Sequence, residues 1–208
     1  MSDVFRALEQ IEAIHDQLAK GEVYRGWRSL PVAASGVVGI AAAAGQSGSP
    51  NQPWLFVGYW LAVAVVAFAV GCSEIAWHYV RHADDTERRR TRLVIGQLLP
   101  ALVAGAIATV ALMQLDPPAV AILPGLWAMM LGVGIFAARP YLPPACIWTA
   151  LFYWSVGLLL LWGGATAGRN AGIAPWGIGL TFGVGQLLAA FTLYWTLERR
   201  QARGDSQA

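Results

Sequence analysis

The chain has 208 residues, of which 57% are hydrophobic and only 12% are charged, and its formal net charge at pH 7 is +2. Soluble domains carry about 25% charged residues, so this composition excludes an ordinary soluble protein and indicates an integral membrane protein. Charged residues fall in short blocks between long apolar stretches, which predicts one compact all-α membrane bundle with the lipid bilayer as its surroundings and no nucleic-acid partner.

Residues 1–26 are expected to form an amphipathic cytoplasmic helix and a linker that precede the membrane bundle. Ser2 or Asp3 can cap the start of this helix, and Gly21 can end it after about 17 residues. Its charged residues leave no room for the apolar run of a cleavable signal peptide, so we expect the segment to be retained. An apolar stripe recurs at steps of four and three residues and consists of Val4, Leu8, Ile11, His15 and Leu18.

This amino-terminal stripe needs a surface to cover it, and three alternatives remain open. It can pack beneath the protein's own bundle, lie on the bilayer, or pair as a coiled coil with another copy of the chain or with a protein partner. Acidic residues on the segment disfavour the bilayer surface, because the cytoplasmic leaflet is itself negatively charged. The stripe is therefore a candidate partner surface.

Six apolar segments are each close to the roughly 20 residues that a helix needs to cross the hydrocarbon core. They cover about residues 27–45, 54–78, 93–115, 119–138, 146–165 and 175–197. Together they predict a six-helix transmembrane bundle over residues 27–197, followed by a polar cytoplasmic tail over residues 198–208. The apolar runs are far longer than the roughly 10-residue strands of a membrane β-barrel.

The positions of the basic residues predict how the bundle is oriented. Lys and Arg in short loops are retained on the cytoplasmic side of a membrane. With the amino terminus in the cytoplasm, 13 of the 14 Lys and Arg residues fall on that side, and Arg169 alone falls outside. We therefore expect a multi-pass protein of the cell membrane, plasma or inner, with both termini in the cytoplasm.

Glu74 is the acidic residue that falls within a predicted span, at the cytoplasmic end of the second apolar segment. An ionisable group inside a membrane is costly, which makes it a functional candidate by default. Steps of four residues place Glu74, His78 and His82 on one helix face, each within reach of the next. This ladder of three residues is the first candidate site of the chain.

Three interpretations of the ladder remain open. In the structural one, which we favour, Glu74 pairs with His78 or with a basic side chain and fixes the helix end. In the second, Glu74 and His78 exchange protons, because histidine titrates near neutral pH and a carboxyl group in a low dielectric retains its proton more readily. In the third, His78 and His82 bind a metal ion, with Asp85 as an oxygen ligand one turn further on.

No cofactor is predicted for these residues. The histidine pair lacks the glutamate of an HExxH metal-binding motif, which makes the metal interpretation the weakest of the three. Haem ligation by two histidines normally uses ligands on opposing helices, whereas His78 and His82 lie on one helix.

Few other polar residues could contribute to a ligand or proton site. Gln97 lies on the third apolar segment at about the depth of Glu74, and Gln186 lies near the middle of the sixth. If Glu74 and Gln97 face each other, they form the floor of a small cavity that opens to the cytoplasm. Isolated polar groups in membranes more often form hydrogen bonds between helices.

Glycines predict close packing of helices. Gly179 and Gly183 form a GxxxG step in the sixth segment, and Gly36 and Gly39 lie in the first. Such steps allow two helix backbones to approach closely, and we expect this contact to lie within one chain.

Enzyme signatures are missing from the sequence: GxSxG, P-loop and HExxH motifs are all absent, which favours a non-enzyme. The charged tract at residues 81–92 is typical of a topology anchor. We expect a non-catalytic bundle with a cytoplasmic partner-binding or regulatory surface, made by the amino-terminal stripe and residues 81–92. The alternative is a small-solute or proton-coupled transporter that uses Glu74 and His78.

Overall fold

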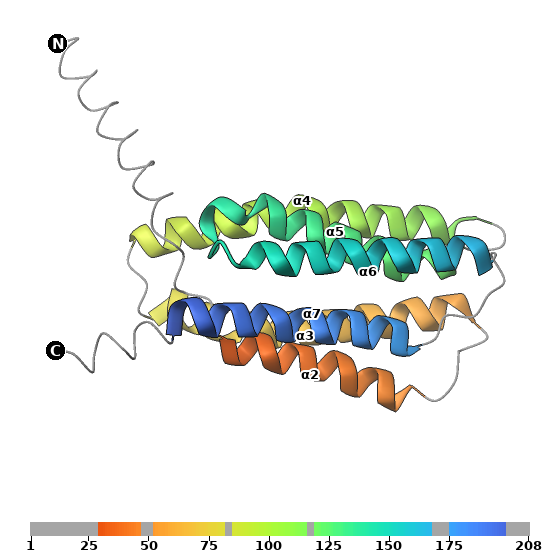
Figure 1. The fold of residues 1–208 in the computed structure, drawn as a ribbon, viewed down its shortest axis with the longest axis horizontal. Helices are drawn as coiled ribbons and strands as arrows, with labels where there is room; N and C mark the ends of the chain where they lie inside the picture. The colour runs from red at the N-terminus through yellow and green to blue at the C-terminus, as the bar shows by residue number, and fades with distance from the viewer. Residues whose placement is uncertain (1–28, 47–51, 82–84, 116–118, 168–174, 199–208) are drawn as a thin grey trace, which may run out of the picture.

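The protein is a bundle of six α-helices that run side by side along one long axis (Figure 1). The computed structural model describes residues 29–46, 52–81, 85–115, 119–167 and 175–198. The helices are α2 (Ser29–Gly45), α3 (Pro53–Arg81), α4 (Asp85–Met113), α5 (Leu123–Ala137), α6 (Cys146–Ala167) and α7 (Pro175–Leu193). The described residues contain no β-strand, and the predicted all-α class with six helices is confirmed.

Three shorter helical elements join or extend these helices. A 3-10 turn, η1 (Val120–Ile122), leads into α5, and a second, η2 (Arg139–Tyr141), connects α5 to α6. A π-helical segment, η3 (Tyr194–Glu198), continues α7. The predicted fourth helix therefore begins with a tighter turn, and Pro124 occupies the first turn of α5, where its missing N–H leaves no helical bond unmade.

Five of the helices are long and apolar enough to cross a membrane, which is compatible with a multi-pass membrane protein. The shorter α2 has 17 residues and spans about 26 Å at 1.5 Å per residue. Helix α3 covers the whole of the predicted second span, residues 54–78, and continues to Arg81. In α4 the apolar part covers Thr91–Met113.

Some predicted features lie outside the described residues. These are the amphipathic helix and linker at residues 1–26 and the polar tail from residue 199 onward, together with His82 and Arg169. The amino-terminal stripe therefore remains a prediction.

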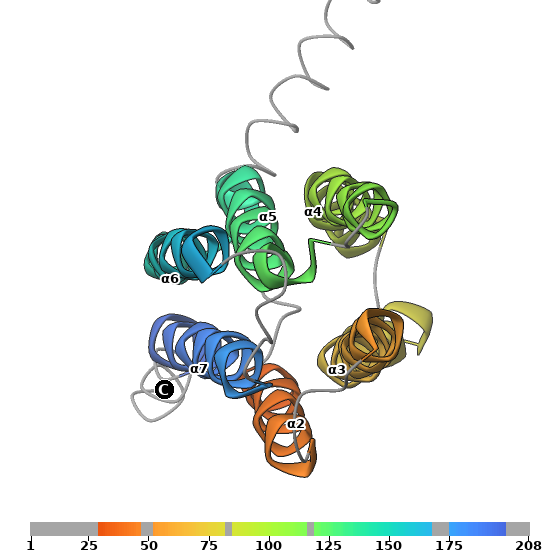
Figure 2. The same ribbon diagram turned by 90° about the vertical axis from the view of Figure 1, so that its right-hand side faces the viewer.

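The six helices form two groups of three, as the view along the bundle shows (Figure 2). One group contains α2, α3 and α7, and the other contains α4, α5 and α6. The most extensive contacts are those of α2 with α7 and of α5 with α6. Helices α6 and α7 join the two groups, whereas the consecutive helices α3 and α4 make only slight contact.

The helices alternate in direction, so the start of α2, the end of α3, the start of α4, η2 and the end of α7 lie together (Figure 1). We call this the basic end of the bundle. The structure describes the side chains of four arginines there, namely Arg88, Arg89, Arg92 and Arg139. The side of the membrane that this end faces stays a prediction.

Helices α2 and α7 pack backbone against backbone through their glycines. A Cβ atom built on Gly36 would lie 2.9 Å from the carbonyl oxygen of Gly183, and one built on Gly179 would lie 2.9 Å from that of Gly39. A Cβ on Gly179 would also overlap Ala43. The expected close approach of Gly179 and Gly183 to another helix of the same chain is confirmed.

A second close contact joins α5 to α6. A Cβ built on Gly125 would lie 2.7 Å from the carbonyl oxygen of Gly157, and one built on Gly157 would lie 3.1 Å from that of Gly125. Further along, Gly164 lies against the backbone of Ala121 in η1. Each group of three helices therefore contains one glycine-lined pair.

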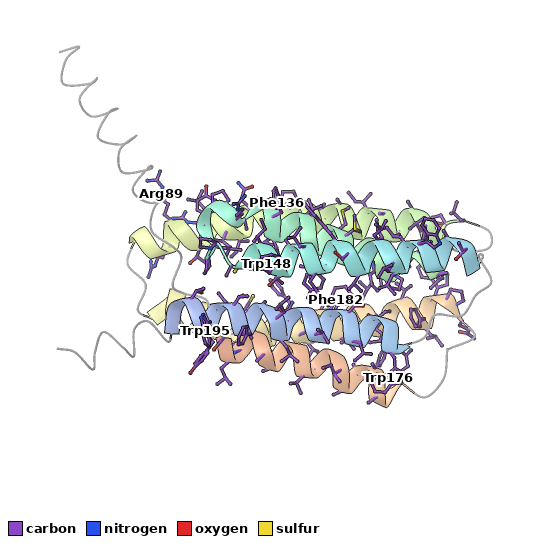
Figure 3. The ribbon with its side chains drawn as sticks, viewed as in Figure 1. Arg89, Phe136, Trp148, Trp176, Phe182 and Trp195 are labelled. Carbon is purple, nitrogen blue, oxygen red and sulfur yellow. The ribbon has the colours of Figure 1, made fainter. Side chains whose placement is uncertain are left out.

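Two buried apolar clusters connect the groups. The cluster toward the basic end includes Val32, Val94 and Leu193, from α2, α4 and the end of α7. The cluster toward the opposite end includes Trp60 and Leu123 and draws residues from α2, α3, α4, α5 and α7. The large side chains on the outside are mainly apolar, as expected of a surface that meets lipid (Figure 3).

Candidate functional site

The candidate site lies where α3 ends and α4 begins. Helix α3 ends at Arg81, and α4 begins at Asp85, before its apolar part starts at Thr91. We call residues 74–81 and 85–90 the hairpin end. At 1.5 Å per residue, its two segments measure about 12 Å and about 9 Å.

Local sequence explains why the hairpin end is helical. Asp85 and Glu87 fall in the first turn of α4, where negative charge interacts favourably with the positive end of the helix dipole. In Figure 1 the start of α4 reaches past the ends of α5 and α6 at the basic end. The hairpin end thus combines charged residues with helical structure.

Glu74 and His78 lie near the end of α3, one turn apart. Glu74 lies seven residues before the last residue of this helix, Arg81. The structural, proton and metal interpretations of the ladder all stay predictions.

The predicted metal set comprises His78, His82 and Asp85. His78 lies on α3 and Asp85 begins α4, but His82 lies outside the described residues. In the part of the chain that the structure describes, no group of three His, Cys, Asp or Glu residues is placed to hold a metal ion.

Gln97 lies on α4 with an exposed side chain. Helix α4 packs mainly against α5 and makes only slight contact with α3. A cavity floor made of Glu74 and Gln97 requires these two helices to approach each other, and it stays a prediction.

Gln186 lies where α7 meets both α2 and α6. Its Cβ atom would lie 3.0 Å from a Cβ atom on Gly36, and its side chain forms a hydrogen bond with Tyr153 of α6. Tyr153 is fully buried, and its hydroxyl group also donates a hydrogen bond of 3.3 Å to the carbonyl oxygen of Phe182. Gln186 therefore holds α6 against α7.

Sequence reasoning missed Tyr153 as the partner of Gln186. The available signal was its position in the middle of an apolar segment, because a buried tyrosine hydroxyl requires a hydrogen-bond partner. Figure 3 shows Phe182 between the two groups of helices, close to this junction.

Other polar side chains of the spans also bond helix to helix. Trp127 Nε1 on α5 donates a hydrogen bond of 2.8 Å to Thr109 Oγ1 on α4. The Tyr59 hydroxyl on α3 donates one of 2.7 Å to the carbonyl oxygen of Ala42 on α2. These bonds satisfy polar groups that a hydrated pathway would leave open to water.

The buried polar atoms without a hydrogen-bond partner among the described residues include Trp60 Nε1, Thr149 Oγ1 and Trp154 Nε1. Trp154 packs against Gly132 and Phe136 between α5 and α6, whereas Trp60 lies in the cluster that α3 shares with α4 and α5. The two indoles thus lie in different packing environments and do not form a common site.

The arginines of the basic end come from α4 and η2. Arg89, Arg92 and Arg139 are exposed, Arg88 is half-buried, and Arg92 Nε donates a hydrogen bond of 3.5 Å to the carbonyl oxygen of Arg88. Ala138 and Leu142, which flank η2, belong to the same cluster as Val94 of α4. Arg139 therefore lies in a turn that packs against the buried face of α4.

The chain shows no significant match to a model of a known protein family, to a curated protein or to a solved structure.

Proposed function

We propose that this chain is a non-catalytic membrane protein that binds a protein partner through its basic end. The observation that supports the proposal is the length of α3 and α4: each helix has 29 residues, about 44 Å at 1.5 Å per residue, which exceeds a hydrocarbon core of about 30 Å. A helix that only crosses the bilayer needs no such length. The charged residues of the hairpin end fall in this excess.

The charges of the hairpin end suit recognition of a protein in water. Asp85 and Glu87 lie next to basic residues in the first turns of α4, and the described Arg89 is exposed. Mixed charges give specificity in an interface, because a partner must match both signs at their positions. The amino-terminal stripe at residues 4–18 forms the second, apolar part of the proposed surface, and the positive-inside rule assigns both parts to the cytoplasm.

The polar groups within the spans favour this function over transport. Gln186 pairs with Tyr153, and Thr109 pairs with Trp127, so these side chains serve contacts between helices. A transporter needs polar groups along a route that water or an ion can follow. Because these side chains are paired, the alternative transport function would depend on Glu74 and His78, which lie at one end of α3.

Photocrosslinking in the native membrane tests the proposal. A photoreactive residue replaces Arg81 or Asp85 at the hairpin end, and the matched control replaces Ile107, which is 65% exposed in the middle of the α4 span. We expect one discrete protein adduct from the hairpin end and none from position 107. Deletion of residues 1–20 should remove this adduct.

Two results would contradict the proposal. The first is the absence of a protein adduct at positions 81 and 85 under conditions in which position 107 crosslinks to lipid. The second is uptake of a solute or protons by vesicles that contain only this chain, abolished by Glu74→Gln, which would favour the transport alternative.

A further inference from the structure

One face of α4 combines arginines with an exposed apolar surface. The residues on it recur at steps of three and four and are Arg89, Arg92, Gly96, Leu99 and Val103. Such spacing places them in one row along a helix. All five are exposed, and we call them the α4 stripe.

The α4 stripe points away from the protein. The buried residues of α4 include Val94, Ala101 and Thr109, which lie on the opposite face and pack toward α5 and η2. Leu99 is 53% exposed and Val103 is 47% exposed within the apolar span that starts at Thr91. The apolar part of the stripe therefore faces the hydrocarbon core, and its arginines lie at the boundary of that core.

Gly96 interrupts the row of side chains directly after the arginines. A Cβ atom built on it would meet no other atom within 4 Å. The packing of the protein therefore does not require glycine at this position. The missing side chain leaves open space at this position between Arg92 and Leu99, and we call this space the notch.

We propose that the α4 stripe binds an anionic phospholipid, whose phosphate contacts Arg89 and Arg92 and whose acyl chain crosses Gly96 and lies against Leu99 and Val103. Guanidinium groups form paired hydrogen bonds with phosphate oxygens. From Arg92 to Val103 the helix rises about 16 Å, which is close to one leaflet of a hydrocarbon core of about 30 Å. The order of charge, notch and apolar surface thus matches a lipid molecule.

The charge of this segment favours an anionic headgroup over a zwitterionic one. Four arginines, at positions 88–90 and 92, outnumber the two acidic residues Asp85 and Glu87 in the first turns of α4. A net positive patch next to a membrane span attracts acidic lipids. An acidic protein would satisfy the arginines but would leave the apolar part of the stripe unused, so the stripe favours lipid.

Native mass spectrometry of the full chain in mild detergent measures this binding. Phosphatidylglycerol and phosphatidylcholine with identical acyl chains are titrated separately onto the purified protein. We expect phosphatidylglycerol to bind about 25-fold more tightly, because each of the two arginines near the headgroup changes affinity about fivefold. Arg89→Gln and Arg92→Gln should each weaken phosphatidylglycerol binding about fivefold.

Two further variants separate this site from general attraction between charges. Arg139→Gln removes the same charge from η2, on the packed side of α4, and should change affinity less than twofold. Gly96→Leu fills the notch without altering charge, and should weaken phosphatidylglycerol binding several-fold while thermal unfolding without lipid stays unchanged. Gly58→Leu is its control, because a Cβ on Gly58 of α3 also meets no other atom within 4 Å.

Three outcomes would overturn the proposal. They are equal affinity for the two lipids, an effect of Arg139→Gln as large as that of Arg89→Gln, and unchanged binding in Gly96→Leu. Competition by millimolar glycerol phosphate would also contradict it, because a site for free phosphate needs no acyl chain. The experiment uses purified chain and lipid alone, so its failure leaves the proposed protein partner untouched.

Discussion

Gly36 of α2 and Gly183 of α7 bring two helix backbones into direct contact. A Cβ atom on Gly36 would lie 2.9 Å from the Gly183 carbonyl oxygen, and one on Gly183 would lie 3.1 Å from the Gly36 carbonyl oxygen. Lipid chains are as apolar as leucine, so close packing must replace the hydrophobic effect in holding such helices together. This pair anchors α2 to α7 and so to the rest of the bundle.

Gly36→Ala should destabilise the bundle. The added methyl group meets backbone, which can move only if α2 and α7 separate, and overpacking of this kind costs about 1–3 kcal/mol. Unfolding of the purified protein in detergent micelles, followed by circular dichroism, measures the loss. Gly58→Ala on α3 is the control, where open space and the helix propensity of alanine predict no loss of stability. Equal effects of both changes would refute the role of Gly36.

Neighbouring glycines on α6 allow a sharper comparison. Gly164 lies against the backbone of Ala121 and Ile122, whereas a Cβ on Gly163 meets no atom within 4 Å. We expect Gly164→Ala to lower the free energy of unfolding by about 1–3 kcal/mol and Gly163→Ala to leave it unchanged or slightly raised. The same micelle unfolding assay applies. A loss of stability in Gly163→Ala alone would show that the α5–α6 contact is wrongly placed.

The hydrogen bond from Trp127 to Thr109 should contribute measurably to the contact of α4 with α5. A double-mutant cycle with Trp127→Phe and Thr109→Val removes each partner alone and then both. Hydrogen bonds between membrane helices average about 0.6 kcal/mol in such cycles, and we expect a coupling energy of this order. Additive losses would mean that the bond does not contribute to stability.

The orientation of the bundle can be tested with single cysteines. In a background where Cys72 and Cys146 are serine, a cysteine replaces Gln46 at one end or Arg139 at the basic end. The positive-inside rule predicts that a membrane-impermeant maleimide labels position 46 in intact cells, and position 139 only after permeabilisation. The reverse pattern would place the basic end outside the cell.

The six helices could be predicted from the sequence because each apolar run is long and uninterrupted. The end of the second helix was harder to place. Ile75, Ala76 and Trp77 extend the apolar character past Glu74, so the predicted span ran to residue 78, whereas α3 continues to Arg81. A helix can continue past the residues that cross a membrane, and hydropathy alone does not show where the helix ends.

The sequence could not predict which helices pack against each other. Glycine spacing indicates that one helix face allows close packing, but it does not identify the helix that packs there. The GxxxG step at Gly179 and Gly183 indicated close packing, but only the structure identifies Gly36 and Gly39 of α2 as its partners. For the same reason Gln186 was predicted as a ligand or proton residue, while its contact with Tyr153 joins two segments far apart in sequence. The helical spacing of Glu74 and His78 was predictable from local sequence alone.

The central claim, a protein partner at the basic end, is tested most directly by measuring the mass of the intact complex released from the native membrane. Wild-type chain is compared with Glu74→Gln and with a chain that lacks residues 1–20. We predict a protein bound at fixed stoichiometry to wild type and to Glu74→Gln, and lost when residues 1–20 are removed. A metal ion or small molecule that is lost in Glu74→Gln, with no protein bound to any of the three chains, would contradict the account.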